Sequence, residues 1–164
     1  MKLVPIGIIH SPCGTAAGTP VQPCFASGIE ARVEVFPEYA EGLRDLEGFE
    51  RIWLLFWCHQ ARAAQLSVVP YRDCHSHGVF ATRAPSRPNP VGMSAVKLLG
   101  IRDTVLHVAG VDILNGTPLL DIKPYVSEYD SYAAQRNGWL DNSDARRNIH
   151  IADERFFDPV KREP

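Results

Sequence analysis

Prolines interrupt the middle of this sequence more than any other feature does. Three of them lie within six residues: Pro85, Pro88 and Pro90. Each proline fixes its own φ, lacks an amide hydrogen and drives the residue before it toward extended geometry. Neither a helix nor a central strand can pass through such a stretch, so residues 78–94 are predicted to form a stiff loop.

The same loop carries three polar side chains: Arg83, Arg87 and Asn89. A stiff backbone would hold them in place before a ligand arrives, which lowers the entropic cost of binding. The loop is therefore a candidate ligand site. The alternative is an exposed turn whose arginines have no role, and only the rest of the chain can separate the two.

The composition is that of an ordinary globular chain, with 164 residues, 45% hydrophobic, 22% charged and a net charge of −2. This length suits one domain. The charge excludes nucleic-acid binding by bulk positive charge alone. Pro5 and Gly7 break the first apolar run, so no signal peptide is predicted. No later apolar run reaches membrane-spanning length. A cytoplasmic protein without membrane contact is expected.

The four cysteines are Cys13, Cys24, Cys58 and Cys74. Without an export signal they are expected to be reduced thiols. Histidines follow two of them, as Cys58-His59 and Cys74-His75-Ser76-His77, which raises the possibility of zinc. The spacing matches none of the usual zinc-ligand patterns, so no metal site is predicted.

Strand patterns dominate the chain. Residues 28–36 alternate between apolar and charged side chains, which predicts a half-buried antiparallel strand. Residues 52–57 are apolar on both faces and too short for a long helix, which predicts a central strand. Residues 4–10 form another short apolar run. Residues 93–99 and 104–109 predict two further strands joined by a turn.

A hairpin is predicted in the second half. Residues 111–114 have a strand pattern and are followed by Asn115-Gly116. This pair favours a type I′ turn, because that turn needs positive φ at both central residues. The return strand over residues 117–125 contains Pro118, which makes it an edge or bulged strand.

Helices are expected to be short. Residues 37–46 and 131–137 have the spacing of brief helices. Trp139 and Leu140 are expected to pack back on the core, and the polar residues 142–148 predict a solvated segment.

These elements together predict a mainly β fold, a small single-sheeted antiparallel β-barrel with one or two short helices. Residues 1–140 would form the barrel domain and residues 141–164 a C-terminal tail. Four apolar side chains suggest that this tail still docks on the domain: Ile149, Ile151, Phe156 and Phe157.

Familiar cofactor motifs are absent from the sequence, including Gly-x-Gly-x-x-Gly after a strand, the Walker phosphate loop and the Gly-x-Ser-x-Gly elbow. Two other motifs carry a family resemblance. Residues 78–94 contain Gly-Val-Phe-Ala-Thr-Arg and then Arg-Pro-Asn-Pro-Val-Gly-Met-Ser, and residues 115–125 read Asn-Gly-Thr-Pro-Leu-Leu-Asp-Ile-Lys-Pro-Tyr. Over about residues 4–140 the chain resembles the TsaA-like family, whose bacterial prototype is the tRNA methyltransferase TrmO.

The resemblance implies a barrel that binds S-adenosylmethionine, typically as a homodimer with the cofactor near the subunit interface. Characterised members methylate N6 of threonylcarbamoyl-adenosine at position 37 of tRNA. The family's cofactor-contacting positions correspond here to Pro20, Val21, Gln22, His59, Gln60, Arg83, Met93, Ile113, Leu114, Asn115 and Gly116.

The chain departs from the family pattern at two of these positions. Val21 stands where the bacterial pattern has arginine, which removes one charged contact. Asn115 stands where it has aspartate; asparagine keeps the turn but removes a charge. Longer members also have an extra C-terminal region without a counterpart here, so their mode of gripping tRNA is not transferred.

Residues near the two motifs are candidates for the acceptor side. An N6 that bears a carbamoyl group is more acidic than a plain adenine amine, so a modest general base suffices. Asp121, Tyr125 and His59 are the candidates for that base. Arg87 or Lys123 would hold the carboxylate of the threonyl group, with arginine favoured for its bidentate geometry. For each residue a structural ion pair or turn contact is the alternative.

Asn89, like Arg87, is assigned either to the acceptor or to the structure of the loop. Three hypotheses follow for the whole chain. The first is an S-adenosylmethionine-dependent tRNA methyltransferase, and the second is a non-catalytic module that binds S-adenosylmethionine or RNA. The third, a metal protein built on the Cys/His pairs, requires stoichiometric zinc.

Overall fold

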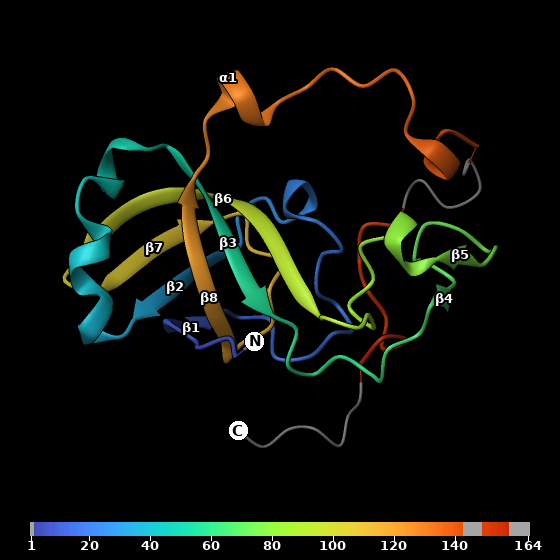
Figure 1. Cartoon of the computed structure of the whole chain (residues 1–164), viewed down its shortest axis with the longest axis horizontal. Helices are drawn as coiled ribbons and strands as arrows, with labels where there is room; N and C mark the ends of the chain where they lie inside the picture. The colour runs from blue at the N-terminus through green and yellow to red at the C-terminus, as the bar shows by residue number, and fades with distance from the viewer. Residues whose placement is uncertain (1, 143–148, 158–164) are drawn as a thin grey trace.

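Six antiparallel strands close into a barrel in the order β1-β2-β7-β6-β3-β8. The computed structural model describes residues 2–142 and 149–157, and its barrel forms one end of the molecule (Figure 1). The strands are β1 Gly7–His10, β2 Glu30–Val35, β3 Arg51–Trp57, β6 Val91–Arg102, β7 Val105–Ala109 and β8 Thr117–Pro124. The predicted mainly β, closed-barrel fold is confirmed.

The alternating pattern of each strand directs one face into the barrel. In β2 every second side chain is buried, as the alternation of residues 28–36 predicted. In β3, Ile52, Leu54 and Phe56 point inward. The intervening aromatic and aliphatic side chains are half-buried on the outer face. The barrel core therefore consists mainly of aliphatic side chains from all six strands.

The predicted hairpin at Asn115-Gly116 is wrong. Residues 111–114 form no strand, and β8 pairs instead with β1 on one side and β3 on the other. The turn is bound to a distant segment, because the amide of Asn115 donates to the carbonyl of Cys13 and that of Gly116 to the carbonyl of Ile9. Gly116 has a positive φ of 75°, whereas Asn115 has not. A type I′ turn needs both.

Pro118 lies inside this closed sheet and not at an edge, opposite Ile8 of β1. The bulge that was the other prediction for this strand is present. The register between β3 and β8 shifts between Leu55 and Phe56. Part of the prediction from Pro118 is thus confirmed.

Helical segments are few and short. The segment predicted over residues 37–46 is a 3-10 helix, Pro37–Leu43, followed by another at Leu46–Gly48. The helix predicted over residues 131–137 is wrong, since the one α-helical turn among the described residues is α1, Ser127–Asp130. Residues 131–137 are exposed, and a short helix without a buried face is not stable alone.

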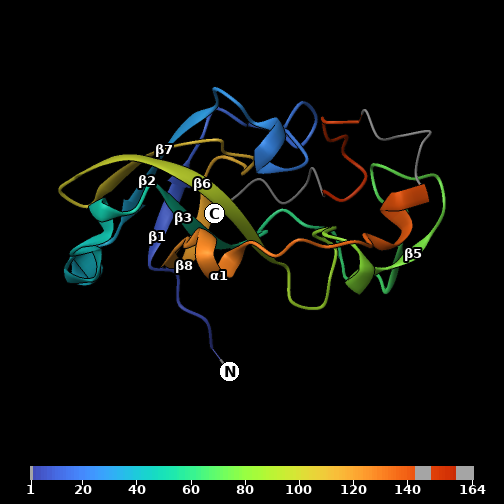
Figure 2. The ribbon, with the colours of Figure 1, turned by 90° about the horizontal axis from the view of Figure 1, so that it is seen from above.

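Residues 58–90, between β3 and β6, form a peripheral lobe beyond one end of the barrel (Figure 2). The lobe contains the two-stranded sheet of β4, Ser67–Val68, and β5, His77–Gly78. Its small core is separate from that of the barrel and includes Val68, Val79 and Phe156.

Residues 149–157, the C-terminal strap, cross this junction and fix it. The amide of Val21 donates to the carbonyl of His150 (2.9 Å), and the amide of Arg62 donates to that of Phe156 (2.9 Å). Phe156 is 4% exposed, so its predicted docking is confirmed, whereas Ile151 is 50% exposed. The solvated segment predicted at residues 142–148 falls almost entirely outside the described residues. In the described chain no helix has the length and apolarity needed to cross a membrane.

Candidate cofactor site

A cavity of about 300 Å³, the central pocket, opens where the barrel meets the peripheral lobe and the strap. Its walls come from segments far apart in the chain: the loop over residues 16–22, the end of β3, the loop over residues 78–90 (the proline loop), the start of β6 and residues 112–114. Its volume lies at the lower end of the range typical of small-molecule sites.

Nine of the eleven predicted cofactor positions line the central pocket: Pro20, Val21, Gln22, His59, Gln60, Arg83, Met93, Ile113 and Leu114. Asn115 and Gly116 are not among the lining residues. The side chain of Asn115 turns toward the barrel, where its Oδ1 accepts a hydrogen bond from the amide of Ser11 (3.2 Å). These two residues hold the neighbouring pocket segment against β1.

Polar contacts join the pocket segments to one another. Arg83 donates from Nη1 to Oε1 of Gln22 (2.6 Å), which links the proline loop to the loop over residues 16–22. Nε2 of Gln60 lies 3.3 Å from Nε2 of His59. Burial lowers the pKa of His59, so its imidazole is neutral at pH 7 and can both donate and accept.

The predicted loop ends earlier than residue 94, because β6 begins at Val91. Within the proline loop, Arg87 makes internal contacts. Its Nη1 donates to the carbonyls of Thr82 (3.0 Å) and Ala84 (3.2 Å). Arg87 also lines the central pocket, whereas Asn89 is exposed and does not. Of the two uses predicted for Arg87, loop structure is therefore present, and a ligand contact is compatible with it.

The other predicted acceptor residues lie on β8 or just after it, and none lines the central pocket. Nζ of Lys123 pairs with Oδ2 of Asp121 at 2.8 Å, and the two side chains are 61% and 43% exposed. The ring of Tyr125 packs at a tilt against Trp53, with centroids 5.5 Å apart. The ion pair that was the structural alternative is thus present for Asp121 and Lys123, whereas Tyr125 makes a ring contact.

Asp112 is the pocket residue that the sequence analysis missed. It is the one carboxylate among the described lining residues, and its Oδ1 accepts a hydrogen bond from Oγ of Ser94 (2.6 Å). Burial raises the pKa of Asp112 to about 6, against smaller opposing effects that include the charge of Arg83. A lone acid within the apolar run Val111-Asp112-Ile113-Leu114 was the available signal, because acids are seldom buried without a reason.

Cys58 also lines the pocket, but its thiol is unreactive. Burial, reinforced by the charge of Asp112, raises the pKa of Cys58 to about 12. The thiolate is the nucleophile and the metal ligand in cysteine chemistry, so Cys58 is a neutral packing residue at pH 7.

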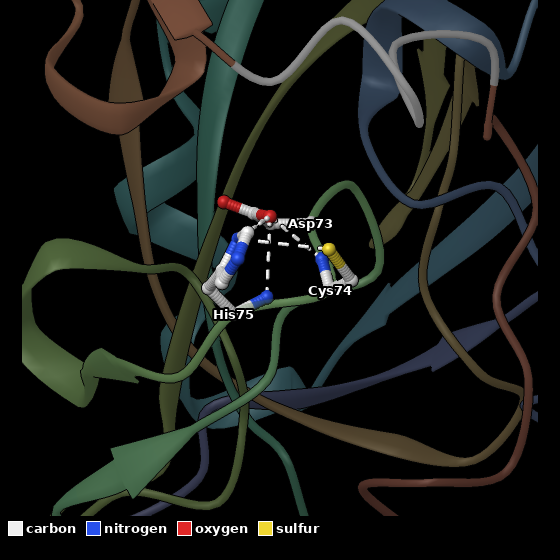
Figure 3. A group of neighbouring side chains, drawn as sticks. All are labelled: Asp73, Cys74 and His75. Carbon is white, nitrogen blue, oxygen red and sulfur yellow. Dashed lines mark hydrogen bonds and ion pairs between the residues drawn. The ribbon is translucent and has the colours of Figure 1, made fainter.

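Asp73, Cys74 and His75 form a group whose side-chain atoms could hold a metal ion (Figure 3). Hydrogen bonds within and around this group also explain its arrangement without a metal ion. Oδ1 of Asp73 accepts from the amides of Cys74 (2.6 Å) and His75 (3.2 Å), and Oδ2 lies 2.8 Å from Nε2 of His77. The hydrogen bond with His77 lowers the pKa of Asp73. The carboxylate thus closes a tight turn.

The chain matches the family model described as tRNA-methyltransferase O N-terminal domain over residues 8–131. It is 50% identical over 153 residues to a Pyrococcus abyssi protein named as a probable S-adenosyl-L-methionine-binding protein, covering 93% of this chain and 83% of that one. It is 37% identical to the human tRNA (adenine(37)-N6)-methyltransferase over 77% of this chain, but spans only 30% of that protein.

A crystal structure of TrmO from Pseudomonas aeruginosa superposes with a TM-score of 0.71 at 40% sequence identity. The superposition covers 84% of this chain and 62% of the crystallised one. The likeness thus includes most of the chain described above, and the chain spans less than two thirds of that relative.

Proposed function

The chain belongs to the tRNA-methyltransferase O family, and from this premise we propose that it transfers a methyl group from S-adenosylmethionine to N6 of adenosine in tRNA. The acceptor we propose is threonylcarbamoyl-adenosine at position 37. The observation that supports this most is the convergence in one pocket of Gln22, His59, Arg83 and Met93, which come from four separate segments.

The chemistry of the pocket fits this cofactor. Phe56, Ile113 and Leu114 offer apolar surface, and Gln22 and neutral His59 offer hydrogen bonds. When bound, S-adenosylmethionine supplies a methyl group on a positively charged sulfur. Arg83 is suited to a carboxylate and Asp112 is the one acid in the described lining, so both signs of charge are present. Transfer from such a donor depends mainly on bringing donor and acceptor together in a dry pocket.

We assign the acceptor's proton to Asp112. Methylation replaces the N6 hydrogen by a methyl group, so one proton must leave N6 for each methyl group that arrives. Oγ of Ser94 donates to Oδ1 of Asp112, and the residue's own backbone amide also donates to the carboxylate. A carboxylate with a pKa of about 6 is largely ionised at pH 7 and is more basic than an ordinary one, which suits a general base. The proton then passes to water.

Arg87 is the residue we assign to the carboxylate of the threonyl group. Its Nη1 is used by the loop, and its guanidinium faces the ring of Phe80 at 6.0 Å from the centroid. The remaining guanidinium donors are available for a carboxylate at the mouth of the pocket. Lys123 is less suited, because it is paired with Asp121 on β8. Asn89 is retained as a further acceptor contact, at the exposed end of the loop.

We also propose a homodimer that works in the cytoplasm, where its tRNA substrate would be. The outer face of β3 and β6 carries exposed or half-exposed apolar side chains in register, with Leu55 opposite Met93 and Trp57 opposite Val91. Such a face favours association. Light scattering of the wild-type chain and of Leu55→Glu should give a dimer and a monomer respectively; a monomeric wild type contradicts the dimer.

The central test combines transfer and binding. The chain is incubated with methyl-labelled S-adenosylmethionine and two tRNAs, one with and one without threonylcarbamoyl-adenosine, and the nucleosides are then identified by mass spectrometry. Label on N6 of the modified adenosine alone is the expected result. Cofactor binding with no label on either tRNA would favour the non-catalytic module, while absence of cofactor binding would refute the methyltransferase.

The role of Asp112 is separated from cofactor binding by one variant. Asp112→Asn should lower kcat by roughly 100- to 10,000-fold, the range of a general base. Calorimetry should give it unchanged affinity for both S-adenosylmethionine and S-adenosylhomocysteine. A selective loss of affinity for the positively charged S-adenosylmethionine would show instead that Asp112 faces the sulfonium.

A further inference from the structure

A second hollow, of about 550 Å³, adjoins the central pocket and shares five lining residues with it: Val21, Gln22, Tyr71, Thr82 and Arg83. Its remaining surface is rich in aromatic rings, among them Phe25, Phe80 and Trp139. We call it the Phe80–Trp139 groove. The position of the groove beside the central pocket makes it accessible to whatever extends from a methyl acceptor bound there.

Phe80 is the most unusual residue of this groove. It is 77% exposed and lies in the 3-10 helix Val79–Ala81 at the start of the proline loop. An exposed phenylalanine buries little apolar area in the free protein, so folding alone gives no reason for its place. The guanidinium of Arg87 lies 6.0 Å from its ring centroid, which adds a positive charge beside the exposed ring.

Trp139, another lining residue of the groove, is fixed by specific contacts. Nε1 of Trp139 donates to the carbonyl of Ala81 (2.8 Å), and its ring stacks on His77 with centroids 4.6 Å apart. His77 is itself held by Asp73, whose Oδ2 lies 2.8 Å from Nε2. Trp139, predicted to pack on the core, therefore packs on the peripheral lobe. Rings fixed in this way lose little freedom when a ligand stacks on them.

Charge points to the same kind of ligand. The described lining residues of the groove include Arg72 and Arg83 but no aspartate or glutamate, although the chain as a whole has a net charge of −2. Aromatic rings combined with arginines are the usual means of binding unpaired nucleotides, since every base can stack and every phosphate is negative.

We propose that the Phe80–Trp139 groove binds an unpaired RNA base next to the methyl acceptor by stacking. This rests on the proposed function, because the acceptor adenosine in the central pocket would bring its neighbour into the groove. It assigns part of the tRNA contact to residues of this chain, without any additional C-terminal region.

The test uses an anticodon stem-loop RNA that carries threonylcarbamoyl-adenosine, with binding measured by fluorescence anisotropy. Phe80→Ala should weaken RNA binding roughly 5- to 100-fold, the range for loss of one stacked base, and leave S-adenosylmethionine affinity unchanged. Phe80→Trp should retain binding. Tyr132→Ala is the matched control, because Tyr132 is also an exposed aromatic residue (82%) but lies outside the groove.

A double-mutant cycle identifies the stacked base. An abasic nucleotide on one side of the acceptor should weaken wild-type binding as much as Phe80→Ala does, and should have no further effect in that variant. Equal binding by wild type and Phe80→Ala overturns the groove proposal. Failure of the wild type to bind this RNA also overturns it, and the transfer assay with labelled cofactor then shows separately whether the proposed function survives.

Discussion

The barrel and the peripheral lobe are stabilised in different ways. The barrel buries aliphatic side chains from all its strands in one continuous core. The lobe has only a small core, and the strap fixes it through contacts such as the hydrogen bond from Oγ of Ser86 to the carbonyl of Phe156 (3.3 Å). The difference separates two tasks: the barrel supplies a rigid frame, and the lobe supplies Arg83, Arg87 and other polar groups around the pocket.

The largest effect is expected for a change in the barrel core. Leu54 is 0% exposed and packs between strands on either side of β3, so Leu54→Ala removes buried contacts and leaves a cavity. The expected loss of unfolding free energy is about 2–5 kcal/mol. Urea unfolding followed by far-UV circular dichroism measures it. A loss below about 1 kcal/mol would contradict a barrel stabilised by one continuous core.

Substitution of Asp112 should raise the free energy of unfolding, whereas substitution of Leu54 lowers it. The pKa of Asp112 is raised from 3.8 to about 6 in the folded chain, so the folded state binds a proton more tightly than the unfolded state does. Its contribution to stability therefore falls as pH rises from about 4 to 6. Asp112→Asn should be up to about 3 kcal/mol more stable than wild type at pH 7–8.

The difference between Asp112→Asn and wild type should vanish below pH 4, where the wild-type carboxyl is protonated in both states. Urea unfolding at pH 4, 6 and 8 measures it. Asp121→Asn is the control, since that carboxylate is 43% exposed on the barrel wall and pairs with Lys123. Equal stability of Asp112→Asn and wild type at pH 8 would show that the ionised carboxylate does not destabilise the folded chain.

Sequence patterns predicted the barrel far better than the pocket rim. Alternation in residues 28–36 and the apolar run of residues 52–57 identified β2 and β3 because a strand buries its side chains at a period of two. Asn115-Gly116 misled, because the partners of its amides, Cys13 and Ile9, lie about a hundred residues away. No local pattern contains such contacts.

Only the part of the candidate site that the family motifs cover could be predicted from the sequence. They supplied nine of the residues that line the pocket, yet gave no indication of Asp112. Its role depends on burial and on a hydrogen bond from Ser94. The stacking of Trp139 on His77 likewise needs a chain crossing from α1 to the lobe, which Figure 1 shows as an extended segment.

Opening the lobe alone should have a smaller effect than damaging the barrel. Phe156 is 4% exposed in the lobe core and packs edge-on against Tyr71, with centroids 5.1 Å apart. Phe156→Ala should lower the free energy of local opening by about 1–3 kcal/mol. Hydrogen exchange should accelerate at the amide of Arg62, which donates to the carbonyl of Phe156, and remain slow in β3. Equal acceleration in β3 would mean that barrel and lobe unfold together.

The smallest effect concerns the polar link between the two loops that line the pocket. The hydrogen bond from Nη1 of Arg83 to Oε1 of Gln22 (2.6 Å) joins exposed side chains, so its net contribution is only about 0.5–1.5 kcal/mol. Gln22→Ala should lower the unfolding free energy by no more than this amount. Because Gln22 lines the pocket, the same change should weaken S-adenosylmethionine binding roughly 2- to 10-fold. Calorimetry measures the affinity, and Arg32→Ala on the outer face of β2 is the control. If Gln22→Ala destabilised the protein as much as Leu54→Ala, the division between a frame held by packing and a pocket held by polar contacts would not stand.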